Sequence, residues 1–451
     1  MSEAKTSERP GPAAALSEAQ RATIARASEA IDIDFILKTL REAVEIPSPT
    51  GEERALGEFF TRTMNQRGIA AQYQPIDEHR GNSIGRVEGT GEGPDLLFYG
   101  HLDTTFTADL DEDRPVLGHA ARPDLQPKFQ RRDDLLFGLG LQNPKGSVTC
   151  AIAALDAVLR SDIGLLGGVT IGLTAGGIHK GPVDGLMRPY RGRHYQGFGV
   201  GCEYMLKHGL TADYCISTKP GYGIVWEEPG ECWFRIEITG GLCYSGLRHI
   251  QPNRNPIVDA AAVIPMIEDW IAAHTKRHTL GQIAPQGTVG AIESGWPFKP
   301  EFIPGICVLY VNVHTNSVQS PHDLRRDFAV LIEDIRRAQG GIEIDFDMLL
   351  SWPGSRTEPD DWIIRSVAGA LEAVEGRPMV VSALSGTTDG PILRNAGIAT
   401  ARVGLPGMAE PEPDWPPMFD ACRIGDLERL SRVYVHALVD TCTRRREEVS
   451  A

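Results

Sequence analysis

The sequence predicts a layered α/β domain that is interrupted by a smaller α+β domain. Apolar strand-like runs alternate with amphipathic helical segments both before residue 226 and after residue 350, which is typical of α/β folds. Between them, the order becomes strand, helix, strand, strand, helix, strand, with one polar face. A chain of 451 residues also exceeds the usual size of a single core. We therefore assign 31–226 and 350–451 to the α/β domain and 227–349 to the insertion.

The first half supplies most elements of the α/β domain. Its helices are marked by apolar residues three or four positions apart, and its strands by short apolar runs between polar or glycine-rich segments. In chain order we expect a helix ending at Pro47, a second helix capped by residues 48–53, strands at 83–87 and 95–99, a polar loop at 106–134, a glycine-rich turn at 138–146 that opens a helix, and a strand at 169–174.

The inserted domain begins with a half-exposed strand. Residues 234–239 alternate apolar and polar side chains, as strands with one wet face do. The remaining predicted elements are a helix over 257–271, strands around 289 and at 307–313, a helix from 322 to about 337, and a strand at 342–346. The α/β pattern then resumes with a helix at 362–374 and a glycine-rich turn at 385–390.

Composition excludes several classes of protein. The formal charge of −15 argues against nucleic acid binding, which needs a clustered basic surface. No stretch approaches the roughly 20 apolar residues of a membrane span. Eight scattered cysteines form no C-x-x-C pair, so neither a zinc knuckle nor a disulfide framework is indicated. Residues 1–30 begin without the apolar segment of a secretion signal, and we expect a disordered tail on a cytoplasmic protein.

The first candidate site follows a buried strand. His101 and Asp103 stand two residues apart in the segment Gly-His-Leu-Asp-Thr-Thr at 100–105. Side chains at such spacing on an extended chain share a face, so the imidazole and the carboxylate can point at one place. This pair therefore indicates either a metal site or a proton-transfer site.

The order of motifs resembles a known family. The segment at 100–105 is followed by Gly-Leu-Gly-Leu-Gln-Asn-Pro-Lys-Gly-Ser at 138–147, by a strand with a glycine-rich end at 175–181, and by the inserted domain. This order is similar to that of the co-catalytic zinc amidohydrolases and exopeptidases, which include aminoacylase, acetylornithine deacetylase, succinyl-diaminopimelate desuccinylase and carboxypeptidase G. The resemblance implies an α/β catalytic domain and a ferredoxin-like inserted domain that serves as a lid and as a homodimer contact.

The resemblance also implies a set of zinc ligands. The family holds two zinc ions with five protein side chains, and a separate Glu acts as general base on a metal-bound water. His101 matches the first ligand, and Asp103 matches the carboxylate that orients it. Asn143 occupies the position of the bridging Asp. A neutral amide cannot clamp two dications as a carboxylate does.

Three further positions depart from the family. Residues 176–178 are Gly-Gly-Ile where the family has its Glu-Glu pair. Lys219 occupies the place of a ligand carboxylate before Pro220, and its ammonium group would repel a metal ion. Tyr244 replaces the His that the inserted domain lends to the partner's active site.

The last ligand of the family is also missing at its expected place. The final His should follow the turn at 404–407, near Pro416, yet no His occurs between His322 and His436. One ligand of five remains, whereas zinc sites use at least three protein ligands. We therefore expect no metal ion and no other cofactor, and we hypothesise that the Lys219 ammonium group replaces the dication by pairing with Asp103.

The remaining side chains around the former zinc site are the functional candidates. His179 is the only imidazole close to the vacated general base position, so it is the best substitute base. The candidates for acid–base chemistry are His179, Asp103, Lys219 and Tyr244, and the candidates for binding substrate are His101, Asn143, Lys145 and Asp389.

Each candidate also has a structural alternative. His179 could be an exposed loop residue, Lys219 a surface cation, and Asp389 the cap of a helix. His274 and His278 have the spacing of a helical zinc pair, but with no third ligand we interpret them as a solvated helix terminus.

Three functions stay open. The first is a repurposed enzyme that acts on a small carboxylate- or amide-bearing molecule through acid–base side chains without zinc. The second is a metal-dependent amidohydrolase acting on an N-acyl amino acid or dipeptide-like substrate, with rearranged ligands such as His101, Asp103 and His179. The third is a non-catalytic dimeric binding protein. The small or polar residues at the former ligand positions favour the first, because they keep a pocket open.

Overall fold

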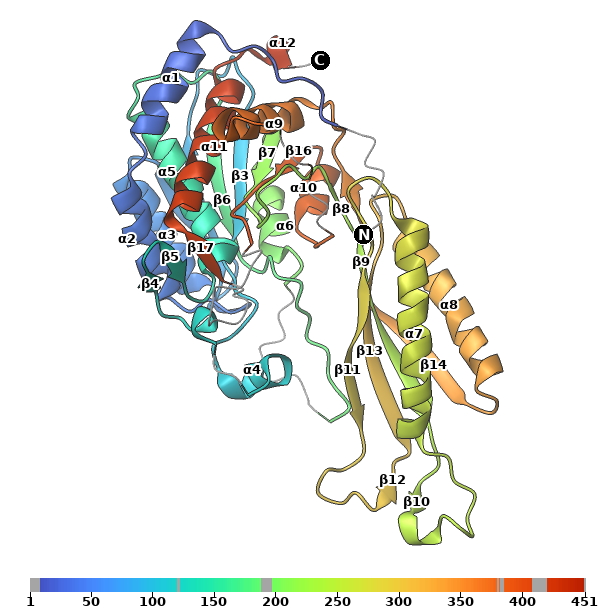
Figure 1. The fold of residues 1–451 in the computed structure, drawn as a ribbon. Coiled ribbons are helices and arrows are strands. Elements are labelled where there is room, and N and C mark those ends of the chain that lie inside the picture. Colours follow the sequence, from blue (N-terminus) through green and yellow to red (C-terminus); the bar gives the residue numbers. More distant parts are fainter. Residues whose placement is uncertain are drawn as a thin grey trace.

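The chain folds into an α/β body from which a second unit projects (Figure 1). The structure is a computed structural model that describes residues 9–119, 122–187, 197–378, 381, 385–407 and 420–449. In this part of the chain, no helix has both the length and the apolar character to cross a membrane.

A six-stranded sheet forms the centre of the body, in the order β1-β2-β6-β3-β7-β16. The strands are β1 (Ala70–Pro75), β2 (Gly81–Val87), β3 (Leu96–His101), β6 (Val169–Thr174), β7 (Tyr214–Ser217) and β16 (Ala399–Arg402). The last four run parallel to one another. The carboxyl ends of parallel strands meet at one edge of a sheet, so the loops after β3, β6 and β7 gather there.

Helices cover both faces of this sheet. One face packs on α2 (Ile33–Val44), α3 (Arg54–Gln66), α5 (Ser147–Leu159), α9 (Trp362–Glu375) and α11 (Ile424–Cys442) in the largest apolar core. The other face carries α6 (Val200–Lys207) and α10 (Gly390–Asn395) with a smaller core. Burial on both faces explains why β3 and β6 are apolar throughout.

The projecting unit has the predicted order of elements. It contains β9 (Glu231–Thr239), α7 (Pro256–His278), β11 (Gly287–Ser294), β13 (Ile306–His314), α8 (Pro321–Ala338) and β14 (Glu343–Trp352). Its antiparallel sheet has the order β11-β13-β9-β14, which is the ferredoxin-like arrangement. The two helices pack on one sheet face and leave the other face open. The predicted fold class, a layered α/β domain with an inserted α+β domain, is confirmed.

Short strands complete both units. Strand β8 (Glu227–Glu228) pairs with β15 (Ser355–Arg356), and β10 (Cys243–Tyr244) pairs with β12 (Phe302–Ile303) at the far tip of the insertion (Figure 1). On the body, β4 (Gln130–Arg132), β5 (Leu135–Phe137) and β17 (Ala421–Arg423) form a small sheet. The predicted loop at 106–134 therefore holds β4 and also a short helix, α4 (Leu110–Leu117).

The expectation of a disordered tail over residues 1–30 is wrong for its second half. Helix α1 (Glu18–Glu29) begins with a capping box, in which Ser17 accepts from the Gln20 backbone and Gln20 accepts from the Ser17 backbone. The Gln20 amide also donates to Thr443 Oγ1 (2.9 Å). These contacts tie the helix to the C-terminal end of α11, which the polar composition of the segment did not reveal.

Candidate functional site

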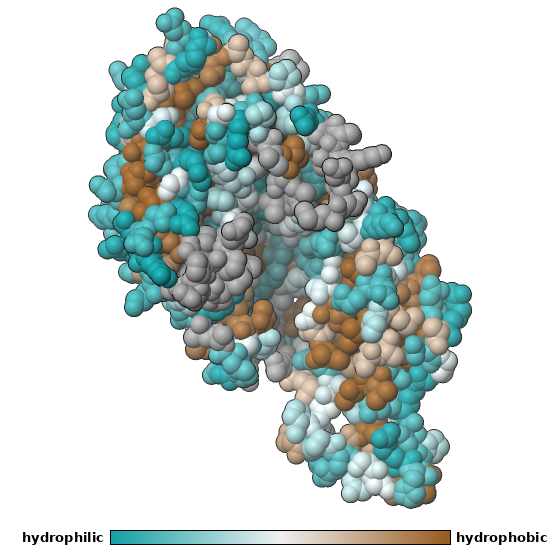
Figure 2. All heavy atoms as spheres, viewed as in Figure 1, coloured by the Kyte–Doolittle hydropathy of each residue, from teal (hydrophilic) through white to brown (hydrophobic). Residues whose placement is uncertain are grey.

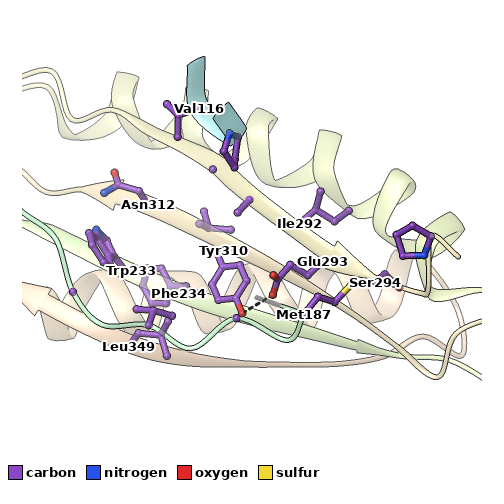
Figure 3. Close-up of a pocket in the computed structure, with 18 residues that line it drawn as sticks. Val116, Met187, Trp233, Phe234, Ile292, Glu293, Ser294, Tyr310, Asn312 and Leu349 are labelled. Atoms are coloured by element: carbon purple, nitrogen blue, oxygen red, sulfur yellow. Dashed lines mark hydrogen bonds between the residues drawn. The ribbon is translucent and has the colours of Figure 1, made fainter. Parts of the chain in front are cut away.

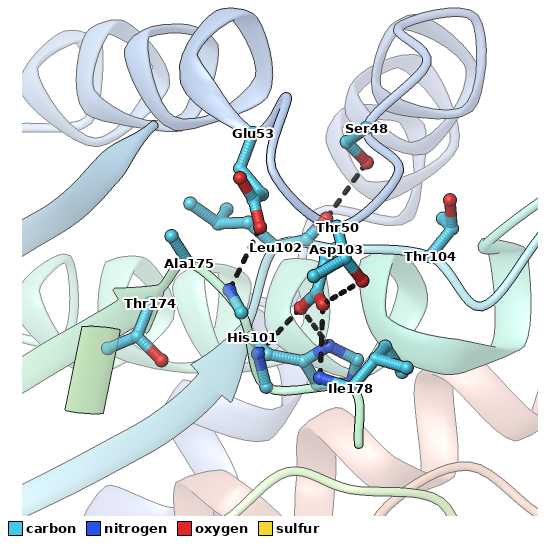
Figure 4. Close-up of polar contacts among 12 residues, drawn as sticks. Ser48, Thr50, Glu53, His101, Leu102, Asp103, Thr104, Thr174, Ala175 and Ile178 are labelled. Atoms are coloured by element: carbon cyan, nitrogen blue, oxygen red, sulfur yellow. Dashed lines mark hydrogen bonds and ion pairs between the residues drawn. The ribbon is translucent and has the colours of Figure 1, made fainter. Parts of the chain in front are cut away.

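The parallel sheet brings the predicted residues together at its carboxyl edge. His101 ends β3, the loop at 175–178 follows β6, and Lys219 follows β7. Figure 4 shows the polar contacts where the first two of these segments meet the loop at 48–53. This edge is where open α/β sheets place their ligand sites.

Asp103 is fully buried and acts as an acceptor for its neighbours. Its carboxylate accepts from the Thr50 hydroxyl (2.7 Å), from the backbone N–H of Gly177 (2.8 Å) and Ile178 (3.0 Å), and lies 3.0 Å from His101 Nδ1. Burial acts to raise the pKa of Asp103, but these partners, with His101 first, lower it. Because both Asp103 oxygens already accept hydrogen bonds, this carboxylate orients His101. The arrangement does not support the predicted acid–base role of Asp103.

Both ring nitrogens of His101 are engaged. Nδ1 faces Asp103, and Nε2 lies 2.9 Å from the side-chain oxygen of Asn143. The ring is about 1% exposed, so no edge is open to a ligand in this arrangement. His101 and Asn143 therefore form a closed hydrogen-bonded wall of the site, and their predicted role in binding substrate stays a prediction.

The loop after β6 turns its backbone toward the site. Gly176 N–H donates to Glu53 (3.0 Å), while the Gly177 carbonyl accepts from Lys219 (2.8 Å). A Cβ atom added at Gly177 would lie 2.4 Å from Cβ of His101 and 2.8 Å from Oδ2 of Asp389. Glycine is thus required here because the backbone itself fills the space between these side chains.

Replacing Gly177 with alanine is expected to lower the free energy of unfolding by about 2 kcal/mol, because the new methyl group overlaps His101. Gly386→Ala is the matched control, since a Cβ there meets no atom within 4 Å. Urea unfolding of both variants measures the difference. Equal stability of the two variants would contradict this account of the loop.

Glu53 belongs to this site although sequence reasoning did not select it. Its Oε1 accepts from the backbone of Gly51 and Gly176, and its Oε2 is buried without a hydrogen-bond partner among the described residues. Burial and then repulsion by Asp103 raise the pKa of Glu53 to about 8. In the sequence, a Glu at the start of a helix is indistinguishable from an ordinary capping residue.

Glu53→Gln is expected to change how stability depends on pH. The folded protein holds the Glu53 proton up to about pH 8, whereas the unfolded chain releases it near pH 4.5, so wild type loses stability as the pH rises through this window. The variant lacks this loss. Its advantage over wild type should grow by roughly 3 to 4 kcal/mol between pH 5 and pH 8, which urea unfolding at both pH values measures.

Lys219 is buried beside two carboxylates. Its Nζ donates to the Gly177 carbonyl. Burial lowers the pKa of Lys219, while Asp389 and, more weakly, Asp103 act to raise it. The alternative that Lys219 is a surface cation is therefore wrong, because the side chain is almost fully enclosed. Asp389 acts more strongly than Asp103 on the pKa of Lys219, and the hypothesised pairing of Lys219 with Asp103 stays a prediction.

Asp389 is fully buried at the start of α10. Its side chain makes no capping hydrogen bond and instead accepts from the Tyr99 hydroxyl, while its Oδ1 has no hydrogen-bond partner among the described residues. Burial raises the pKa of Asp389, against the opposing effects of Lys219 and then His179. Asp389 therefore faces the other candidate residues, and the alternative of a simple helix cap is wrong.

His179 forms a buried pair with a residue of the inserted domain. Its Nδ1 lies 2.6 Å from Glu231 Oε2, and its Nε2 is buried with no hydrogen-bond partner among the described residues. The imidazole packs on Phe198 and Trp352, with ring centroids 4.6 and 5.3 Å away. The alternative that His179 is an exposed loop residue is wrong.

Glu231 is anchored from several sides. Trp233 Nε1 donates to Oε1 (2.7 Å), the Asn312 amide donates to the same oxygen, and Thr387 donates to Oε2. Burial alone would raise the pKa of Glu231, but the hydrogen bond and charge of His179, with Trp233, lower it to about 2. Glu231 is therefore a fixed carboxylate that holds the Nδ1 proton of His179.

Two predicted residues do not join this site. Lys145 is fully buried and donates to the carbonyl of Ile46 (2.9 Å), and burial lowers its pKa to about 7, so its contacts give it a structural role. Tyr244 lies at the tip of the insertion, is 46% exposed and packs on Phe302. Strand β10 projects away from the body (Figure 1), so Tyr244 lies apart from the other candidates of its own chain, and its predicted catalytic role stays a prediction.

The histidine pair on α7 is also structural. His274 is buried and its Nε2 lies 2.9 Å from the His314 carbonyl. It stacks against Trp270, with centroids 5.2 Å apart. The expectation of a solvated helix terminus is therefore wrong for His274, which packs between the helix and the sheet.

The described residues do not fit the zinc site of the family. Among them, no three His, Cys, Asp or Glu side chains are arranged to hold a metal ion. The Asp103 oxygens and both nitrogens of His101 are engaged by protein groups, and His179 is bound to Glu231. The expected position of the last family ligand, near Pro416, lies outside the described residues.

Comparison with known proteins identifies relatives for nearly the whole chain, although no family model matches. Succinyl-diaminopimelate desuccinylase of Methylorubrum extorquens is 25% identical over 414 residues, which cover 88% of this chain and 96% of that protein. A probable carboxypeptidase of Aspergillus clavatus is 29% identical over 261 residues, but these span only 56% of this chain and 52% of that protein.

Solved structures share the fold. Human carnosine dipeptidase 1 has a TM-score of 0.67 and 14% identity, with coverage of 96% of this chain and 100% of that chain. An M20 family metallo-carboxypeptidase from Sulfolobus solfataricus has a TM-score of 0.63 and 15% identity, with coverage of 90% and 99%. This chain therefore shares the fold of these peptidase structures and is similar over most of its length to succinyl-diaminopimelate desuccinylase, in agreement with the resemblance seen in its motifs.

Proposed function

We propose that this protein binds a small carboxylate- or amide-bearing molecule and acts on it through acid–base side chains, without the two zinc ions of its family. The observation that carries the proposal is the buried His179–Glu231 pair, whose Nε2 atom has no hydrogen-bond partner among the described residues. A carboxylate that holds the Nδ1 proton leaves Nε2 as the basic nitrogen, which is the arrangement of a general base.

The neighbouring groups suit this role. Lys219 supplies a buried positive charge near Asp389 and Asp103, so a negatively charged group of a substrate gains electrostatic stabilisation there. His101 and Asn143 close the wall of the site where the family binds metal. In this proposal His179 takes up and returns the proton, Glu231 positions His179, and Lys219 stabilises negative charge.

We also propose that the protein forms a homodimer through its inserted domain. Apolar side chains lie on the surface of the projecting unit (Figure 2). The exposed ones include Leu242, Ile250, Ile257, Val258 and Phe298. Exposed apolar side chains of this kind support contact with a second chain. Size-exclusion chromatography with light scattering tests the homodimer. We also propose that the protein is located in the cytoplasm, which cell fractionation tests.

Metal analysis with activity assays tests the proposed chemistry. Purified protein is expected to hold far less than one zinc ion per chain. The rate of turnover of N-acyl amino acids and dipeptides should be the same with and without the chelator 1,10-phenanthroline. His179→Asn is expected to reduce turnover by roughly 10²- to 10⁴-fold, the usual contribution of a general base. Stoichiometric zinc together with hydrolysis that the chelator abolishes would overturn the proposal.

A further inference from the structure

A large cavity lies on the open face of the inserted sheet. It has a volume of about 1000 Å³ and is bounded by β9, β11, β13 and β14, by the segment at 181–187 and by the end of α4. Figure 3 shows Val116 of α4 on one side and Trp233, Tyr310 and Leu349 of the sheet on the other. Ligand pockets are commonly about 300 to 1000 Å³, so this volume suffices for a substantial organic group.

The lining of the cavity is mostly apolar. Its side chains include Val116, Val183, Met187, Trp233, Ile292 and Leu349. Among the described lining residues the one carboxylate is that of Glu293, which already accepts from the Tyr310 hydroxyl (3.4 Å) and from the Leu186 backbone. No Lys, Arg or His occurs among the described lining residues. Such a surface suits an uncharged apolar group, because its lining is mostly apolar and its carboxylate, Glu293, would repel an anion.

The inner end of the cavity is continuous with the His179 pair. Trp233 and Asn312 line the cavity, and both also donate hydrogen bonds to Glu231. Glu231 in turn holds His179. A Cβ at Gly181, another lining residue, would contact both Trp233 (3.6 Å) and Phe198 (3.7 Å), and Phe198 packs on His179. The cavity thus shares its walls with the proposed catalytic pair.

We propose that this cavity binds a large uncharged apolar group, such as a medium or long acyl chain, of the molecule whose polar end reaches His179. The inference rests on the proposed function for the role of His179, but not for the apolar site itself. Its substrate class is therefore an amide or carboxylate compound that carries an acyl chain, rather than a small polar dipeptide.

Calorimetric binding of two homologous series tests the apolar site without requiring turnover. The probes are N-acylglycines with acetyl, hexanoyl and dodecanoyl chains, and N-alkylacetamides of matching length, which lack the carboxylate. Each buried CH₂ is expected to tighten binding by up to roughly fourfold until the cavity is filled. The gain should appear in both series, because it arises from the chain and not from the head group.

Ala291→Phe blocks the cavity in this test. Ala291 is an exposed lining residue on the edge strand β11, where an aromatic side chain is well tolerated. The variant should lose at least tenfold in affinity for the dodecanoyl compounds and little for the acetyl ones. Ala273→Phe, at an exposed position on α7, is the matched control and should bind all compounds as wild type does.

The outcomes separate this inference from the proposed function. Wild-type affinity that is independent of chain length, or equal losses in Ala291→Phe and Ala273→Phe, overturns the apolar site. His179→Asn should keep the dependence on chain length, because it leaves the cavity lining intact. If His179→Asn also retains full turnover, the proposed chemistry fails while the apolar site stands.

Discussion

Glu231→Gln should abolish most of the acid–base activity while leaving the fold intact. The glutamine oxygen can still accept from Trp233 and Asn312, but its amide group now donates toward His179. Nδ1 must then accept, so the proton moves to Nε2 and the nitrogen that served as base becomes a donor. An inverted tautomer of this kind typically lowers turnover by about 10⁴-fold.

The stability of the variants distinguishes a role of Glu231 in positioning His179 from a role in packing alone. Glu231→Ala leaves four donors without their acceptor and should lower the free energy of unfolding by about 3 kcal/mol, whereas Glu231→Gln should lose much less. Nitrogen-15 chemical shifts of His179 report the tautomer directly. Unchanged shifts in Glu231→Gln, or turnover close to wild type, would contradict the role given to this carboxylate.

The same carboxylate should make wild type sensitive to acid. The pKa of Glu231 is about 2 in the folded protein and ordinarily 4.5, so its contribution to stability is complete above pH 4.5 and is lost as the pH falls toward 2. Glu231→Gln does not titrate there. The difference in unfolding free energy between the two proteins should therefore shrink between pH 4.5 and pH 2.

The sequence predicts the centre of the site better than its rim. The His101–Asp103 pair follows from strand periodicity alone, because side chains two positions apart on an extended chain point to the same face. Lys219 and Asp389 could be placed only through the family resemblance, which brings their loops to the same sheet edge. Glu231 gives no such signal, since it is one polar residue at the start of an alternating strand, 52 positions from His179.

The errors of the sequence prediction have a common physical cause. Helix α1 and the buried His274 are stabilised by partners distant in sequence, Thr443 and the His314 carbonyl, and such contacts override local composition. Lys145 was assigned by its motif, yet its side chain points into the body toward Ile46. A motif fixes the position of the backbone, but the direction of a long side chain depends on packing.

Lys219→Met should destabilise the protein by about 3 kcal/mol at pH 8, because removing one partner of a buried charged cluster leaves the other charge uncompensated. The affected group is Asp389, whose pKa is already raised by burial and which Lys219 partly restrains. Without the lysine, that pKa rises further. The folded state then holds the Asp389 proton over a wider range, so the loss of stability should grow as the pH rises from about 4.

A double-mutant cycle identifies the partner of Lys219. Asp389→Asn keeps an acceptor for the Tyr99 hydroxyl but removes the negative charge, so Lys219→Met in that background should cost much less than in wild type. Asp103→Asn is the comparison, because Asp103 acts more weakly on Lys219. Coupling that is larger with Asp103 than with Asp389 would restore the original hypothesis, in which the ammonium group replaces a metal ion beside His101. Absence of coupling with either carboxylate would mean that the lysine is held only by the Gly177 carbonyl.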